Sequence, residues 1–366
     1  MKRFIAAFAA AALLFTLNAC SAGGESVVTQ SPQLTTQAQT QSETQQAAQP
    51  AWQWQKDSPE DQGVDAAVLS AVHDTFDSFA LNASVIVRNG YIIDEYYKDG
   101  YDENSVFTLH SASKSITSAL FGIALDMGVI ESLDTPLSQY FPQVLENEDA
   151  YWQQITLRHL LTHTSGIDMN EGADWYAWRA SDNWVQYILS RRVTSRPGTQ
   201  FNYLTENTHL LSAVLEQASG MSLYEFGKRC LFDPMGMRSV TLAQDAQGVS
   251  DGGNGFSMNI YDMAKFGRLF LNGGEWQGEQ LVPADWVEES TTVQFERSSG
   301  SADYGYQWWV RTFGDNTYHA YFAPGHGGQY IFVVPELELV IAFTSNYEGA
   351  SSIYWRLVNQ IVNACR

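Results

Sequence analysis

Ser111 and Lys114 are spaced so that they could share one face of a helix and do chemistry there. They lie in the segment LHSASKSITS (109–118), just ahead of an apolar run. Residues at i and i+3 of a helix are neighbours, so the lysine amine could reach the serine hydroxyl directly. A hydroxyl is a poor nucleophile at neutral pH and needs such a base. Burial and the positive end of the helix dipole would both lower the pKa of the lysine and suit it to this role.

The position of this pair is stronger evidence than its spacing, because an S-x-x-K match arises easily by chance. Of the six lysines in the chain, only Lys114 has a serine three residues before it, and it stands at the start of the most apolar helix that the sequence predicts. We therefore expect Ser111 to be a nucleophile whose own backbone N–H faces an oxyanion.

A second serine, Ser250, fits the G-x-S-x-G pattern in GVSDG (248–252). That pattern is catalytic where a strand precedes it and a helix follows it. Here a polar segment precedes it and a glycine-rich segment follows, so we expect Ser250 to lie in a surface loop without a catalytic role.

The surrounding segments predict an α+β fold. Residues 83–97 read as a hairpin around Asn89-Gly90, a buried helix follows over 111–128, and residues from about 130 to 245 read as helices and loops. Strand patterns return at 304–310, 329–335 and 337–346, and an amphipathic helix closes the chain at 353–365. We therefore expect an antiparallel sheet flanked by helices, with a mostly α lobe inserted at about 130–245.

The first 51 residues read as an export and anchoring signal. Lys2 and Arg3 precede an apolar run of 14 residues, 4–17, which suits a signal peptide and is too short to cross a bilayer. The sequence LNAC (17–20) resembles a bacterial lipobox, so we expect a signal peptide over 1–19 and lipid on Cys20, with simple secretion as the alternative. Residues 20–51 are rich in Ser, Thr and Gln, which predicts a disordered tether.

This signal places the domain, residues 52–366, at the bacterial cell envelope on the periplasmic side. We expect it to be held to the membrane by the lipid, at the outer membrane rather than the inner one in a Gram-negative cell. We also expect a monomer.

Charge and composition limit the partners and cofactors. The 20 Lys and Arg against 41 Asp and Glu give a net charge of −21, which would repel nucleic acid. His159 and His163 of HLLTH lack the intervening glutamate of a zinc-hydrolase helix, so we expect packing roles and no metal or other cofactor. Cys230 and Cys365 could pair in an oxidising compartment, but two separate buried thiols are the favoured prediction.

Phrases along nearly all of residues 52–366 resemble the serine β-lactamase and penicillin-binding-protein superfamily, in its class C and esterase-like branch. They include HSASKSITSALFGIALDMGVI, LRHLLTHTSGI, DMAKFGRLFLNGGEW and GHGGQYIFVVPELELVIAF. The first family motif, S-x-x-K, matches Ser111 to Lys114. The third, K-T-G or H-x-G, matches His326-Gly327-Gly328, followed by Gln329 where the family has its second oxyanion N–H.

The second family motif, Y-x-N, falls on Tyr203-Leu204-Thr205, so threonine replaces the asparagine. In the family that asparagine helps to orient the lysine and the substrate amide, and its absence weakens the case for a dedicated β-lactamase. The segment FNYLTENTHLL looks closer to the 6-aminohexanoate-dimer hydrolase branch, which carries Ser or Thr there and an asparagine two residues on, here Asn207.

The resemblance implies an acyl-enzyme mechanism. Lys114 and Tyr203 would move the proton of Ser111, the N–H groups of Ser111 and Gln329 would hold the oxyanion, and His326 and Gly328 would contact substrate. Several aromatic residues could wall the pocket, above all Trp175 and Tyr176, and also Trp178, Tyr304, Tyr306, Trp308 and Trp309.

We therefore predict a metal-free serine hydrolase of small amide, ester or peptide substrates. A β-lactamase or a D-Ala-D-Ala-type peptidase is the alternative within the same chemistry. A non-catalytic envelope lipoprotein that keeps the fold and binds peptidoglycan stems or a partner is the alternative of another class.

Overall fold

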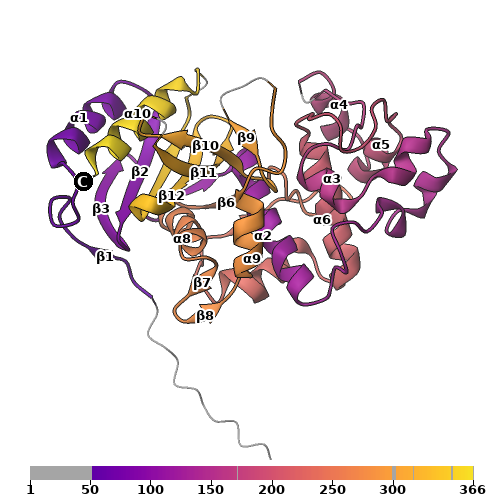
Figure 1. Cartoon of the computed structure of the whole chain (residues 1–366), viewed down its shortest axis with the longest axis horizontal. Coiled ribbons are helices and arrows are strands. Elements are labelled where there is room, and N and C mark those ends of the chain that lie inside the picture. Colours follow the sequence, from indigo (N-terminus) through magenta and orange to yellow (C-terminus); the bar gives the residue numbers. More distant parts are fainter. Residues whose placement is uncertain (1–51, 171, 299–301, 316, 348, 366) are drawn as a thin grey trace, which may run out of the picture. The chain divides into compact units, whose positions relative to one another are not determined.

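The computed structural model describes residues 52–366, apart from 171, 299–301, 316, 348 and 366 (Figure 1). The expected signal peptide, the lipid on Cys20 and the tether lie outside the described residues. Within the described part of the chain, no helix is both long enough and apolar enough to cross a membrane.

An eight-stranded sheet forms one half of the described structure. Its strand order is β1-β3-β2-β13-β12-β11-β10-β9, and every pair is antiparallel except β1 with β3. The strands are β1 Gln55–Lys56, β2 Leu81–Arg88, β3 Tyr91–Tyr97, β9 Asp303–Tyr304, β10 Trp309–Phe313, β11 Tyr318–Gly325, β12 Gln329–Val334 and β13 Leu339–Ser345. Two smaller sheets contain β4 Val106–Thr108, β5 Thr241–Leu242 and β6 Phe256–Asn259, and β7 Glu275–Trp276 with β8 Glu279–Gln280.

Both faces of the large sheet are buried, and alternate residues face opposite cores. On β2, Val85 and Val87 join one hydrophobic cluster, whereas Ile86 joins the other. The cluster of Ile86 lies under α1 Ala66–Asp77 and α10 Ser352–Ala364, which Figure 1 shows side by side. The opposite face packs on α8 Ile260–Leu271. This arrangement explains the nearly continuous apolar runs of the central strands.

The hairpin predicted around Asn89-Gly90 is present. Strands β2 and β3 are joined at these two residues, whose φ angles are +49° and +85°. Two consecutive positive φ values are what a tight two-residue hairpin turn needs, and glycine adopts them at no steric cost.

The helical lobe lies to one side of the sheet (Figure 1). It contains α3 Leu157–Leu161, α4 Trp175–Arg179, α5 Trp184–Leu189, α6 Thr205–Ser219 and α7 Leu223–Gly227, with the short helical turns η2 Leu137–Gln139, η3 Pro142–Glu146, η4 Ala150–Gln154 and η5 Lys228–Phe232. Helix α2, Ser113–Asp126, packs against both α6 and β11, so it joins the lobe to the sheet. Helix α9, Ala284–Thr291, covers α2 from another side. The prediction of a helical middle is confirmed.

The prediction of one continuous strand over 304–310 is wrong, because residues 305–308 lie outside the sheet. Strand β9 ends at Tyr304 and β10 begins at Trp309, with Gln307 between them at a φ of +64°. The buried Gln307 amide donates to the Leu161 carbonyl at 2.8 Å and accepts from the Thr208 hydroxyl at 2.7 Å. The chain leaves the sheet here because these bonds hold Gln307 against the helical lobe.

Cys230 and Cys365 are both free thiols. Cys230 packs on the cluster that extends through the helical lobe, and Cys365 packs on the cluster under α1 and α10. Burial raises the pKa of both thiols.

Candidate active site

Ser111 lies in the middle of the single turn η1, His110–Ala112, which leads directly into α2. This turn is held between sheets: the Leu109 N–H donates to the Phe256 carbonyl of β6 at 2.8 Å, and η1 packs against β11 and β12. A Cβ atom on Gly325 would lie 2.0 Å from the Leu109 carbonyl oxygen, so only glycine lets β11 approach this closely. The half-buried Ser111 side chain therefore sits where the large sheet meets the helical lobe.

Lys114 brings its amine to Ser111 from the first turn of α2. Its Nζ donates to Ser111 Oγ at 3.0 Å, to Thr205 Oγ1 at 2.9 Å and to the Gly253 carbonyl at 2.9 Å. The residue is 1% exposed. A buried amine needs such hydrogen bonds, and here one of its acceptors is the hydroxyl that it could deprotonate.

The Gly253 carbonyl belongs to a tight turn that the sequence reasoning missed. A Cβ atom on Gly253 would lie 2.8 Å from Thr205 Cγ2, and one on Gly252 would lie 2.6 Å from Thr117 Oγ1. The Gly252 carbonyl in turn accepts from Thr117 Oγ1 at 2.7 Å. These glycines let the turn press against α2 and α6, so the paired glycines in SDGGNGF were the signal for a close backbone approach.

Ser250 is buried, and the prediction of a surface loop is wrong. It precedes the glycine turn, and its N–H donates to Glu216 of α6 at 3.1 Å. The segment is buried because it packs against α2 and α6, the helices that carry Lys114 and Thr205.

The Tyr203 ring lies beside the Lys114 amine. Its ring centroid is 4.9 Å from Lys114 Nζ and 4.6 Å from the centroid of the His163 ring. Burial, reinforced by the charge of Lys114, holds the pKa of His163 well below its usual range, so this ring is neutral. Helix α3 ends at Leu161, so His159 and His163 do not share one helix face, although both pack in the lobe.

Asn207 has partners other than Lys114. Its Oδ1 accepts from Ser165 Oγ at 2.9 Å, and its Nδ2 lies 3.3 Å from His163 Nδ1. The asparagine two residues beyond Thr205 therefore does not take the place of the missing motif asparagine. Thr205 itself makes the contact with the lysine.

Gln329 is the first residue of β12, the strand next to η1. Its side-chain amide donates to the Ser345 carbonyl at 2.6 Å and to the His326 carbonyl at 3.4 Å. These bonds fix the start of the strand, from which the predicted oxyanion N–H would come.

Gly328 closes the turn between β11 and β12. Its φ is +93°, and a Cβ atom there would lie 1.8 Å from the Tyr354 hydroxyl. The adjacent Gly327 has a φ of +75°, but a Cβ atom there would meet nothing closer than 3.4 Å. Gly328 is therefore required both by backbone conformation and by space.

The Ser111 hydroxyl opens into a cavity of about 560 Å³. Its other lining residues are His110, Gly172, Trp175, Tyr176, Asn254 and His326. The ring centroids of His110 and His326 lie 5.6 Å apart. Burial, together with the charges of His326 and Lys114, lowers the pKa of His110, although Asp251 acts in the opposite direction.

The structure separates the predicted aromatic residues into three groups. Trp175 and Tyr176 line the cavity, and Tyr176 is 79% exposed. The ring centroid of Trp309 lies 5.7 Å from that of Tyr203. Four others are buried in the protein interior: Trp178, Tyr304, Tyr306 and Trp308. His110 and Asn254 were missed, because neither carried a sequence signal apart from its nearness to a motif.

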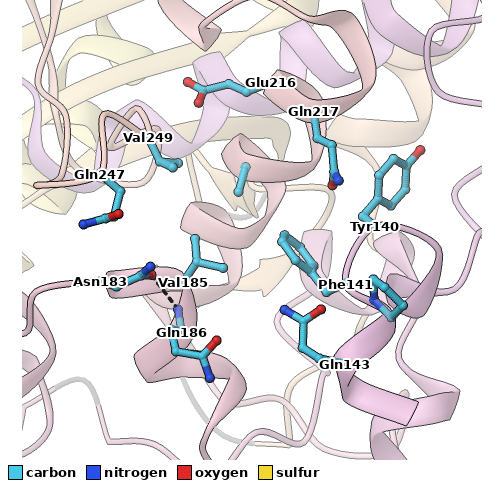
Figure 2. Close-up of a pocket in the computed structure, with 12 residues that line it drawn as sticks. Tyr140, Phe141, Gln143, Asn183, Val185, Gln186, Glu216, Gln217, Gln247 and Val249 are labelled. Carbon is cyan, nitrogen blue, oxygen red and sulfur yellow. Dashed lines mark hydrogen bonds between the residues drawn. The ribbon is translucent and has the colours of Figure 1, made fainter. Parts of the chain in front are cut away.

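A larger cavity, of about 600 Å³, lies in the helical lobe away from Ser111. Figure 2 shows Asn183, Val185 and Gln186 on one side of it, facing Phe141 and Gln143 on the other. Its lining includes five amide side chains and one carboxylate, but no serine, cysteine, lysine or histidine. The smaller cavity at Ser111 is therefore the candidate active site.

Within the described residues, no three histidine, cysteine, aspartate or glutamate side chains lie close enough together to hold a metal ion.

Comparisons with known proteins agree with this geometry. The family model described as Beta-lactamase matches residues 75–360. The 6-aminohexanoate-dimer hydrolase of Paenarthrobacter ureafaciens is 24% identical over 299 residues, which cover 75% of this chain and 74% of that protein.

Two solved structures have a similar fold. A Bacillus anthracis protein provisionally identified as a 6-aminohexanoate-dimer hydrolase aligns with a TM-score of 0.70 at 23% identity, over 80% of each chain. EstCE1, a hydrolase with promiscuous acyltransferase activity, aligns with a TM-score of 0.68 at 18% identity, over 84% of this chain and 99% of its own.

Proposed function

Because the chain belongs to the Beta-lactamase family and is a hydrolase of that family, we propose that it cleaves small amides or esters through an acyl-enzyme on Ser111. The observation that carries this proposal is the buried Lys114 amine, 3.0 Å from Ser111 Oγ and held by two further acceptors. The family relatives named as hydrolases argue against a purely binding protein.

In the proposed mechanism, Ser111 Oγ bonds to the substrate carbonyl carbon while its proton passes to Lys114. The N–H groups of Ser111 and Gln329 hold the resulting oxyanion. Collapse of this intermediate breaks the bond to the leaving nitrogen or oxygen, which takes up the proton by way of Tyr203. Water then hydrolyses the ester on Ser111 by the same route and releases the acid.

The substrate class that we favour is a linear amide or a carboxyl ester. Two features support it: the similarity to a 6-aminohexanoate-dimer hydrolase, and threonine in place of the motif asparagine at position 205. His326 and the aromatic side chains of Trp175 and Tyr176 would contact the acyl or leaving group from the cavity wall.

Covalent labelling tests the nucleophile. A fluorophosphonate probe should add its mass to the peptide that contains Ser111, and Ser111→Ala should abolish that addition. Ser250→Ala is the matched control, because it removes the serine of the competing G-x-S-x-G pattern and should leave labelling unchanged. Equal labelling of the Ser111→Ala protein would reject the assignment.

A turnover panel then tests the substrate class. It contains p-nitrophenyl esters, 6-aminohexanoate dimers, a chromogenic cephalosporin and D-Ala-D-Ala peptides, each run beside Ser111→Ala. We expect the esters or the aminohexanoate dimers to give the highest kcat/KM. A higher kcat/KM for the cephalosporin or for the D-Ala-D-Ala peptides would favour a β-lactamase or a peptidase instead.

We also propose that the enzyme works as a monomer held to the bacterial envelope by lipid on Cys20. The lipobox-like LNAC sequence and the polar segment after it support this proposal. The wild type should partition into detergent and Cys20→Ser into the aqueous phase, while light scattering should give the mass of one chain. Aqueous partition of the wild type would reject the anchor.

A further inference from the structure

Arg179 and Asp251 form an ion pair between two segments that both reach the candidate active site. Arg179 Nη1 donates to Asp251 Oδ2, and Asp251 is only 1% exposed. The other carboxylate oxygen, Oδ1, is buried and has no hydrogen-bond partner among the described residues. Arg179 is therefore what compensates this buried charge.

On one side, the pair holds the wall of the cavity. Arg179 is the last residue of α4, the five-residue helix that carries Trp175 and Tyr176. Its guanidinium carbon lies 3.9 Å from the ring centroid of Trp184 and 5.2 Å from that of Trp175. Such a short helix is not stable alone, so its position depends on contacts of this kind.

On the other side, the pair holds the turn that anchors Lys114. The Asp251 carbonyl accepts from the Gly255 N–H at 2.7 Å, which closes the turn around Gly253. The Gly253 carbonyl accepts the hydrogen bond from Lys114 Nζ at 2.9 Å. The next residue, Asn254, lines the cavity.

We propose that Arg179 and Asp251 are positioning residues that fix the aromatic wall of the cavity and the orientation of Lys114 together. This inference rests on the proposed function, in which Lys114 activates Ser111. Loss of the pair should displace both segments, so that substrate binding and proton transfer are impaired together.

Two readouts separate this role from a merely structural one. The rate constant for labelling of Ser111 by a small fluorophosphonate reports the orientation of Lys114, because the probe needs little contact with the wall. KM for a p-nitrophenyl ester with a bulky acyl group reports the wall when acylation is slow. A residue that only stabilises the fold would change the urea midpoint and neither of these values.

The variants are Asp251→Asn, Arg179→Gln and their combination in the full-length protein. Arg179→Gln leaves a buried carboxylate unpaired, so it should lower the labelling rate and kcat/KM most, by roughly 30-fold or more, and raise KM. Asp251→Asn removes the charge and keeps an acceptor, so about a threefold to tenfold loss is expected. The double variant should resemble Asp251→Asn rather than show the product of the two losses, because its buried charge is gone.

Arg192→Gln is the matched control. Arg192 belongs to the same lobe, and its ion pair with Asp149 spans 3.8 Å on an arginine side chain that is 77% exposed. Its loss should change both readouts less than about twofold. If Arg179→Gln does not fold, the labelling rate and KM of Asp251→Asn alone test the inference, because that variant leaves no unpaired carboxylate in the interior.

Variants that label at the wild-type rate with unchanged KM would overturn the inference while leaving the proposed function intact. The inference would also be overturned if the loss of labelling rate and kcat/KM in the double variant equalled the product of the losses in the two single variants. A wild type that is not labelled at Ser111 would overturn the proposed function itself and, with it, this inference.

Discussion

Thr205 Oγ1 accepts a hydrogen bond from Lys114 Nζ at 2.9 Å, at the position where the family motif commonly has asparagine. Threonine thus supplies one of the contacts expected of the asparagine, namely an oxygen acceptor for the lysine. It has no N–H group with which to meet a substrate amide. The replacement therefore keeps an acceptor for the lysine and exchanges the amide N–H donors of asparagine for a single hydroxyl.

Thr205→Val should lower kcat/KM for a p-nitrophenyl ester about tenfold, because valine has nearly the same shape but cannot accept from the amine. Thr208→Val is the control one turn along the same helix, where the hydroxyl bonds Gln307 and not the lysine. That variant should lose stability and keep kcat/KM within about threefold. Equal losses in the two variants would show that the Thr205 hydroxyl has no special role.

Thr205→Asn should raise cephalosporin turnover more than ester turnover. An amide needs more help than an ester in protonating its leaving group, so it depends more on groups that orient Lys114, Tyr203 and the substrate. The comparison needs kcat/KM for both substrates in both proteins. Efficient cephalosporin hydrolysis by the unmutated enzyme would contradict this argument.

Gly328→Ala should impair the enzyme far more than Gly327→Ala. Both residues have positive φ, so each substitution should cost about 1 kcal/mol or more in backbone strain. Only the alanine at 328 would also collide with the Tyr354 hydroxyl and push the start of β12 away from η1. We expect at least a tenfold larger loss of ester kcat/KM for Gly328→Ala, and similar losses would disprove the steric argument.

Two neighbouring aromatic residues should respond in opposite ways. Tyr176 is 79% exposed and lines the cavity, so Tyr176→Ala should raise KM and leave the urea midpoint nearly unchanged. Trp178 is fully buried, so Trp178→Ala should cost about 3–5 kcal/mol of unfolding free energy. A large stability loss in Tyr176→Ala would indicate that this side chain packs rather than binds.

His163 should make the protein less stable as the pH falls. Its pKa is well below the usual value in the folded state, first because of burial and then because of Lys114. Below about pH 6.5 the unfolded chain therefore takes up a proton that the folded chain does not, and stability falls by up to about 1.4 kcal/mol per pH unit from this residue.

Urea unfolding at pH 7.5 and pH 5.5 measures this effect. His163→Gln should be less stable than the wild type at pH 7.5 but should lose less stability on acidification. The exposed His319→Gln is the control and should follow the wild-type pH dependence. An unchanged pH dependence in His163→Gln would contradict the prediction.

Local patterns were enough to predict most of the fold. The hairpin at Asn89-Gly90, helix α2 and helix α10 all follow from short-range signals: a turn dipeptide and apolar residues at helical spacing. The predicted strand over 304–310 failed because its aromatic residues suit a sheet, whereas the position of Gln307 is set by hydrogen bonds to the distant Leu161 and Thr208. A tertiary contact of this kind has no local signature.

Part of the candidate site was also predictable from a local pattern. Ser111 and Lys114 lie in one motif, and the structure brings them to 3.0 Å. The Gly253 acceptor and the pair of Arg179 with Asp251 were not predictable, because each joins segments far apart in sequence. For Ser250, polar neighbours suggested solvent exposure, but the segment is buried because its backbone N–H groups find partners in Glu216 of α6 and in Ala243, just after β5.

The pairing of β2 with β13 also determines when the candidate active site can assemble. Strand β2, Leu81–Arg88, is made well before its neighbour in the sheet, Leu339–Ser345, because about 250 residues separate them in the sequence. Until that strand has been made, β2 and β12 have no common partner, and the sheet whose strands β11 and β12 pack on the turn of Ser111 is incomplete. Strand pairing over such a sequence separation is slow, since a long loop must close before any contact stabilises it. A nascent or truncated chain can thus contain both Ser111 and Lys114 and still have no assembled candidate site.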